Sequence, residues 1–168
     1  KEITEMKVIC YSGKVLDSKV DSKNGDSYSD YNFIKTMTAL TTLDLSESGS
    51  EDMRVPDNAF KGMTALTDVK MPERDIIWGK NIFTGTGVDE ITFPQALTTL
   101  DNSYYVSGGK DVVSANEVLD GIKYVYTSIT VVGRIHLNTN TSPYFFVPDN
   151  YTRDAYRELY GSKYADWY

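Results

Sequence analysis

One stretch of the chain, residues 58–72, recurs along the sequence and limits the folds that this protein can adopt. It reads N-A-F-K-G-M-T-A-L-T-D-V-K-M-P, and a similar stretch in the same register begins 26 residues earlier, at Asn32. A looser copy follows in the segments 81–85 and 88–94. Repetition at a period of about 20 to 30 residues is typical of a solenoid, in which each repeat packs against its neighbours.

The apolar residues of each copy share the spacing L-x-x-L-x-L. The four sets are Ile3, Met6 and Val8; Leu40, Leu43 and Leu45; Leu66, Val69 and Met71; and Val88, Ile91 and Phe93. The last two members of each set are two residues apart, which is the period of a strand with one buried face. The spacing therefore predicts four parallel strands stacked as successive repeats.

A second motif lies between the predicted strands, in the segments 55–60, 78–83 and 100–105. Each segment has an apolar residue, a polar turn with Asn or Asp, and a bulky pair that ends in an aromatic ring. We expect the ring to cover the core on the side opposite the strands. Gly62 and Gly85 follow two residues after the ring, where a short helical turn ends on a left-handed residue.

Past residue 105 the repeats become irregular. Residues 107–111 are predicted to form a turn, and Leu119, Asp120 and Gly121 echo the ending Phe60, Lys61 and Gly62. Three later segments are rich in β-branched and aromatic residues and are predicted strands. These segments are 122–126, 129–137 and 144–147.

The end of the chain is predicted to cap the last repeat. Residues 152–160 form an amphipathic pattern with Thr152 as N-cap and Gly161 past the end. We expect this helix to cover the core with an apolar stripe that includes Ala155. The capping residues are predicted to be Tyr156, Leu159, Tyr160, Tyr164 and Trp167.

The 168 residues predict a single domain. Its parts are 1–31 (first repeat and polar insert), 32–105 (regular repeats), 106–148 (irregular repeats) and 149–168 (cap).

A net charge of −7 without a basic run argues against a nucleic-acid partner. The longest apolar runs are far too short to span a bilayer. Cys10 is the single cysteine, so no internal disulfide can form.

The polar insert, residues 13–30, has two interpretations. Its oxygen-bearing side chains are Asp17, Asp21, Asn24, Asp26 and Asp30. They suit either a solvated acidic loop or a calcium site, but Lys23 stands where an EF-hand ligand belongs. We therefore expect the loop and no metal.

The sequence supplies little for catalysis. His136 is the single histidine, and the alternation of the predicted strand 129–137 places it opposite Ile135 and Leu137. No nucleophile-elbow motif is present. The G-T-G at residues 85–87 lacks the third glycine of a dinucleotide site. The sequence predicts a protein that binds without catalysing and needs no cofactor.

Two candidate binding surfaces follow from the pattern. The residues predicted to point outward from the strands are Thr42, Asp44, Asp68, Lys70, Glu90 and Thr92. They form either an ordinary solvated face or a groove for a protein or glycan. The second candidate is a group of aromatic residues, Tyr104, Tyr105, Tyr124 and Tyr126. They form either a platform for sugars and proteins or a cover for the irregular part of the core.

The motif A-F-x-G-M-x-x-L-x-x-V-x-M-P at residues 59–72 resembles the BspA-type leucine-rich repeat of bacterial and some protozoan surface proteins. The family consensus has a cysteine where Met63 stands. The ending F-V-P-D-N-Y-T-R-D-A-Y-R at residues 146–157 is similar to the closing segment of those proteins. The resemblance covers residues 32–100 and 146–159, whereas the spacing departs from the family over 13–30 and 107–135.

The resemblance implies a right-handed leucine-rich-repeat solenoid that is rich in β-structure, with short helical turns and a C-terminal capping helix. We expect about five to seven repeats in its parallel sheet. The resemblance also implies a secreted or cell-surface location, for example in an outer-membrane lipoprotein. The function it implies is adhesion or binding to a host or extracellular protein, without catalysis. Two alternatives are a glycan-binding accessory module of polysaccharide uptake and a structural spacer without a ligand.

Overall fold

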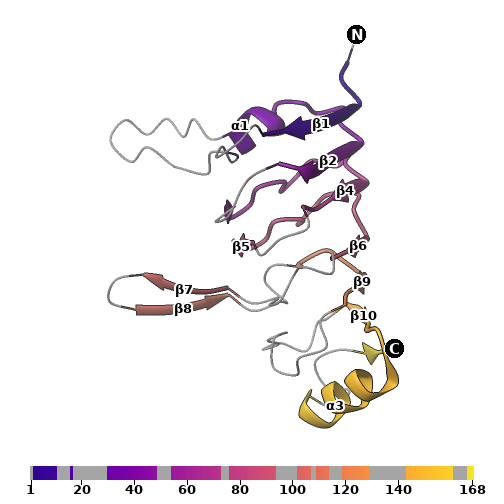
Figure 1. The fold of residues 1–168 in the computed structure, drawn as a ribbon. Coiled ribbons are helices and arrows are strands. Elements are labelled where there is room, and N and C mark those ends of the chain that lie inside the picture. Colours follow the sequence, from indigo (N-terminus) through magenta and orange to yellow (C-terminus); the bar gives the residue numbers. More distant parts are fainter. Residues whose placement is uncertain are drawn as a thin grey trace.

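Seven strands of the computed structural model form two parallel sheets that follow one another along the molecule. The described residues are 2–10, 16, 30–48, 54–72, 76–93, 102–106, 109–113, 119–128, 143–160 and 166–168. The first sheet contains, in order, β1 (Glu5–Ile9), β2 (Thr42–Glu47) and β4 (Asp68–Lys70). The second contains β6 (Glu90–Thr92), β9 (Tyr124–Tyr126), β10 (Tyr144–Phe146) and β11 (Asp166–Trp167). Figure 1 shows these strands in one column, from β1 near the N-terminus to β10 near the C-terminus.

Buried side chains stack from strand to strand because the strands pair in register. Leu43 pairs with Val69 in the first sheet. Val125 pairs with both Ile91 and Phe145 in the second sheet. All five side chains are buried. Successive residues of a strand point to opposite faces, so the residues between them form a face turned to solvent.

The apolar positions that the repeats predicted to be buried are buried, apart from the first set. The buried positions are Leu40, Leu43, Leu45, Leu66, Val69, Met71, Val88, Ile91 and Phe93. In the first set, Ile3 precedes β1 and is 52% exposed, whereas Met6 and Val8 are half-buried. Since β1 is the outer strand of its sheet, the described residues cover it from one side only.

The turns opposite the strands have the backbone that the second motif predicted. Asn58 and Asn81 have φ angles of 59° and 55°, and Gly62 and Gly85 have φ angles of 81° and 72°. These are left-handed conformations, which Gly adopts freely and Asn tolerates. Successive turns are hydrogen-bonded to each other: the Gly62 N–H donates to the Thr84 carbonyl at 2.9 Å. The short strands β3 (Arg54–Val55) and β5 (Ile77–Trp78) pair in parallel just before these turns.

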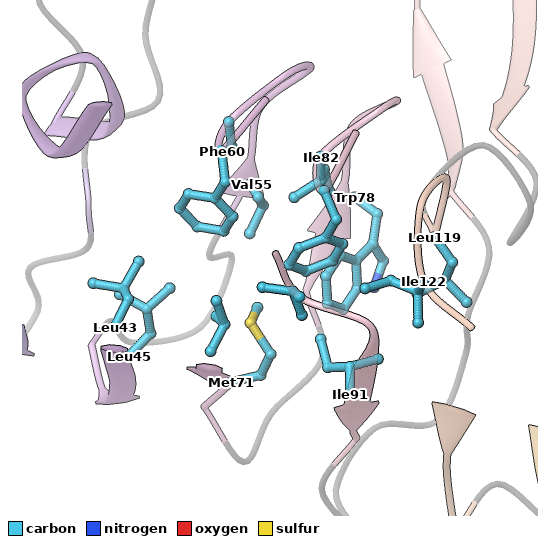
Figure 2. Packing of buried hydrophobic residues seen from close by; sticks show 14 of the residues in the cluster. Leu43, Leu45, Val55, Phe60, Met71, Trp78, Ile82, Ile91, Leu119 and Ile122 are labelled. Atoms are coloured by element: carbon cyan, nitrogen blue, oxygen red, sulfur yellow. The ribbon is translucent and has the colours of Figure 1, made fainter. Parts of the chain in front are cut away.

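The hydrophobic core lies between the strands and the turns. Figure 2 shows Leu43, Leu45, Met71 and Ile91 from the strand side facing Val55, Phe60, Trp78 and Ile82 from the turn side. A column of three rings crosses two successive turns and one short helix. The Phe60 ring lies 5.9 Å from those of both Tyr31 and Phe83. Tyr31 comes from the short helix α1 (Asp30–Lys35), so this helix extends the column by one repeat.

The third copy of the turn motif was placed wrongly at residues 100–105. Residues there belong to β7 (Asn102–Val106), which pairs antiparallel with β8 (Gly109–Val113) in a hairpin. The predicted turn at residues 107–111 therefore includes the start of β8. The true third copy is at Leu119, Asp120 and Gly121, where Gly121 has a φ of 97°. The hairpin extends away from the column of parallel strands in Figure 1.

The C-terminal helix differs from the prediction in its start and in its buried face. Helix α3 runs over Asn150–Tyr160, so it begins two residues earlier than expected. Its N-cap is Asp149 and not Thr152, because the Asp149 carboxylate accepts from the Thr152 N–H at 2.7 Å. Tyr156 and Thr152 are buried, but Leu159 is 52% exposed and does not belong to the cap. Strand β11 follows the helix, which is therefore not the last element of the fold.

Some predictions fall outside the described residues. The insert at 13–30 is described only at Leu16, which is buried, and at Asp30, which begins α1. The predicted strand 129–137 with His136 lies outside, as do Gly161, Tyr164 and the side chains of Tyr160 and Trp167. The later predicted strands at 122–126 and 144–147 are confirmed as β9 and β10.

Candidate functional site

The solvent face of the two parallel sheets is a continuous surface made of two rows of side chains. The first row contains Glu5, Thr42, Asp68, Glu90, Tyr124 and Tyr144, and the second contains Lys7, Asp44, Lys70, Thr92, Tyr126 and Phe146. Strand pairing fixes both rows within each sheet. Across the junction, β4 and β6 are neighbours in Figure 1 and in contact. We call this surface the binding face.

The junction between the two sheets keeps the register of the repeats. Val69 and Ile91 are both buried at the centres of β4 and β6. Asp68 and Lys70 flank Val69 on β4, and Glu90 and Thr92 flank Ile91 on β6. All four flanking residues are exposed. The Gly87 N–H donates to the Leu66 carbonyl at 2.8 Å, just ahead of both strands. The exposed side chains of β4 and β6 therefore lie on the same face.

The half of the binding face near the N-terminus is charged. Lys7 and Glu47 form an ion pair at 2.6 Å, and this hydrogen bond raises the pKa of Lys7. Asp44 accepts hydrogen bonds from the Ser46 hydroxyl at 2.6 Å and from the Ser46 N–H at 2.9 Å. These two bonds are the main causes that lower the pKa of Asp44. The Lys7–Glu47 pair is exposed on both sides, so it adds little to stability.

The half near the C-terminus is aromatic. Tyr124 stacks on Tyr144 at a centroid distance of 5.6 Å, and Tyr126 stacks on Phe146 at 4.7 Å. Phe146 stacks in turn on Tyr168 at 5.3 Å, and Tyr144 lies 5.9 Å from Tyr168 at a tilt of 52°. These five rings, which we call the aromatic cluster, come from β9, β10 and the residue after β11.

The stacking decides which part of each ring is open. The rings stack along the direction that runs from strand to strand, with interplanar angles of 23° and 15° for the two pairs. Neighbouring rings therefore cover each other's faces and leave their edges and hydroxyl groups to solvent. Tyr124 and Tyr126 stand at the start of their stacks, where the neighbours in register are Glu90 and Thr92. Each thus turns one ring face toward β6.

The structure unites most of the two candidate surfaces that the sequence indicated. Eight predicted residues share the binding face: Thr42, Asp44, Asp68, Lys70, Glu90, Thr92, Tyr124 and Tyr126. Tyr104 and Tyr105 lie on β7 of the hairpin and not on a strand of this face. Their side chains lie outside the described part of the structure. The grouping of Tyr104 and Tyr105 with the other two tyrosines therefore stays a prediction.

Sequence reasoning missed three members of the aromatic cluster: Tyr144, Phe146 and Tyr168. A signal for two of them was present. The segment Y-F-F at residues 144–146 alternates in the same way as Y-V-Y at residues 124–126. Its central residue is buried in both cases, so its outer residues had to point to the same face.

Outside the binding face, the described residues form a small hollow but no cluster suited to a metal ion. A hollow of about 230 Å³ lies among Glu2, Ile3, Thr36, Met37, Thr38 and Ala39, where Glu2 is the only ionisable side chain. Within the described ranges, no group of three His, Cys, Asp or Glu side chains is placed to hold a metal ion.

Burial raises the pKa of Tyr31, so this phenol stays protonated within the core. No helix in the described part of the chain is long and apolar enough to cross a membrane.

The whole chain matches no protein-family model, no curated protein and no solved structure.

Proposed function

We propose that this chain is a non-catalytic leucine-rich-repeat solenoid at a cell surface or in the extracellular space, which binds a protein through the binding face. The aromatic cluster is the observation that carries the proposal. The fold assignment is supported by the stacked parallel strands and by the left-handed turns at corresponding places in the repeats. The extracellular location is supported by the resemblance of residues 59–72 to repeats of bacterial surface proteins.

The position of the aromatic cluster supports a binding role. Tyr124, Tyr126 and Tyr144 are each between 38% and 39% exposed, and Tyr168 is 53% exposed. The corresponding positions of β2 and β4 carry only polar or charged residues. A contiguous exposed group of aromatic residues is typical of a protein interface, where Tyr and Phe are enriched. Cross-strand aromatic pairs also stabilise a sheet, but only by about 0.2 to 1 kcal/mol each.

Ring geometry favours a protein over a glycan as the partner. A sugar stacks on an open ring face, whereas most faces in the aromatic cluster are covered by the next ring. The exposed ring edges and tyrosine hydroxyls suit a protein surface with both apolar and polar groups. Glycan binding is the second candidate, because Tyr124 and Tyr126 each keep one ring face turned toward β6.

A double variant tests the proposal. Tyr126→Ser with Tyr144→Ser removes one ring from each stack, while Tyr151→Ser removes an 82% exposed ring on α3 that is not one of the five rings of the aromatic cluster. Both variants are first checked by thermal unfolding and then tested on arrays of extracellular proteins and of glycans. We expect protein ligands that the wild type and Tyr151→Ser bind and that the double variant loses.

Three other outcomes of these array measurements would contradict the proposed protein-binding role of the aromatic cluster. Ligands found only on the glycan array, with the same dependence on the two rings, would favour the second candidate. Binding that the double variant and Tyr151→Ser retain equally would place the site away from the aromatic cluster. An absence of binding on both arrays would favour a structural spacer.

A further inference from the structure

We infer that the binding face receives an arginine side chain of the partner protein between the ring of Tyr124 and the carboxylate of Glu90. This inference rests on the proposed function and adds the chemical character of the partner. Its basis is the point at which the charged half of the binding face meets the aromatic half. Glu90 and Tyr124 are paired in register on neighbouring strands there.

The first row of the binding face carries negative charge only. Its ionisable residues before the aromatic cluster are Glu5, Asp68 and Glu90. The second row differs, because Lys7 and Lys70 flank Asp44 on the neighbouring strands. Asp68 and Glu90 occupy corresponding positions of adjacent strands, where like charges disfavour one another. A cation bound in the first row would relieve this repulsion.

Tyr124 follows Glu90 in the first row and presents a ring face to it. One face of the ring is stacked on Tyr144, and the other is turned toward Glu90. A cation over an aromatic face is attracted by the ring quadrupole, and a carboxylate beside it adds charge attraction. Glu90 and Tyr124 are both exposed, so a partner can reach them. The pair thus offers both kinds of attraction to one positively charged group.

The described cations closest to Glu90 and Tyr124 along the strands have other neighbours. Lys123, which precedes Tyr124, lies 3.7 Å from Asp89, which precedes Glu90. Lys70 belongs to the second row, where its neighbour on β2 is Asp44. Thr92, beside Glu90 on the same face, carries no charge. No hydrogen bond or ion pair of Glu90 with these side chains occurs among the described residues.

The chemistry of the pair selects arginine among possible occupants. A metal ion prefers several oxygen ligands, but the described residues place no three such side chains together. A second copy of this chain would bring the same acidic face, so the two faces would repel one another. The planar guanidinium group can lie flat on the ring while its fork of N–H groups donates to the carboxylate, whereas the lysine ammonium group has no plane that can stack.

A pair of peptides tests the inference. One is a ten-residue glycine–serine peptide with three arginines, and the other has citrulline, which is uncharged and nearly the same shape, at those positions. Titrations of the protein are followed by ¹⁵N-resolved NMR spectra. We expect the arginine peptide to shift the amide signals of β6 and β9, and the citrulline peptide to bind about fivefold more weakly or worse.

Matched variants separate the site from general attraction between an acidic protein and a cationic peptide. Glu90→Gln should weaken binding of the arginine peptide about threefold, whereas Glu158→Gln, the same change at an exposed site on α3, should not. Tyr124→Leu should weaken binding and Tyr124→Phe should keep it, because phenylalanine retains the ring face. Tyr151→Leu on α3 is the control for loss of an exposed ring.

Two results would overturn the inference. One is equal binding of the arginine and citrulline peptides. The other is an equal effect of Glu90→Gln and Glu158→Gln, which would indicate attraction to net charge alone. Either result leaves the proposed function intact, provided that the array ligands still depend on Tyr126 and Tyr144. Loss of that dependence would instead contradict the proposed function.

Discussion

Gly79 lies directly against the backbone of Asp57, which belongs to the preceding turn. A Cβ atom added to Gly79 would lie 2.3 Å from the Asp57 backbone nitrogen and 2.4 Å from the Pro56 carbonyl carbon. Two hydrogen bonds hold the two turns at this distance. The Gly79 N–H donates to the Val55 carbonyl, and the Lys80 N–H donates to Asp57 Oδ1, each at 2.8 Å. Successive turns can therefore pack at this spacing only because residue 79 has no side chain.

Gly79→Ala should destabilise the protein by about 3 kcal/mol, because a backbone cannot move aside as a flexible side chain does. Gly62→Ala is the control. Gly62 has a φ of 81° and no atom within 4 Å of an added Cβ, so its replacement should cost only about 1 kcal/mol of conformational strain. Urea denaturation of both variants measures the difference. Equal losses would show that the contact with Asp57 relaxes easily.

Leu66→Ala should destabilise the protein by about 2 to 5 kcal/mol, because Leu66 is fully buried between the strands and the turns. Asp68→Ala, two residues further on, should change stability by no more than about 0.5 kcal/mol, since Asp68 lies on the exposed face. Thermal unfolding of the two variants compares the two faces of the same repeat. Similar losses from both changes would contradict the strand register.

The contrast between Leu66 and Asp68 shows why much of the fold was accessible from sequence. Burial alternates along each strand, and the same alternation recurs in each copy, so local patterns predicted the strands, the core and the solvent face. Gly62 and Gly85 likewise revealed the left-handed turns, because few other residues tolerate that conformation. Such features depend on a few neighbouring residues.

The hairpin and the aromatic cluster depend on pairing between distant segments. Residues 102–106 mimic the turn motif locally, although the Ser-Gly-Gly at 107–109 is a hairpin signal that fits β7 and β8. Tyr168 reaches Phe146 only because β11 pairs with β10, and a two-residue strand carries no sequence pattern of its own. The binding face was thus predicted strand by strand, but only Tyr124 and Tyr126 of the five rings in its aromatic half were predicted.

Ser46→Ala should raise the pKa of Asp44 toward its ordinary value, because the Ser46 hydroxyl is the largest cause of the lowered pKa. A carboxyl group whose pKa is lower in the folded state stabilises the fold above about pH 4, and this contribution is lost as the pH falls through the lowered pKa. The loss of stability on acidification should therefore be smaller in Ser46→Ala than in the wild type. NMR titration of the Asp44 carboxyl carbon measures the pKa directly, and an unchanged value would assign the shift to the Ser46 N–H, which the variant keeps, together with Lys7 and Lys70.

Asp149→Ala should destabilise the protein by about 1 kcal/mol, because it removes the N-cap of α3. The Asp149 carboxylate accepts from the Thr152 N–H at 2.7 Å and from the Thr152 hydroxyl at 3.1 Å, and Thr152 is itself buried. The change therefore leaves two buried donors without this acceptor. Asp149→Asn should retain most of the stability, since the amide oxygen can still accept from the N–H. Asp154→Ala, at an exposed site one turn further along the helix, is the control for loss of charge. Amide hydrogen exchange should show faster opening of the first turn of α3 in Asp149→Ala alone. Equal exchange in the Asp149→Ala and Asp154→Ala variants would mean that charge near the helix start, and not the cap, holds α3 in place.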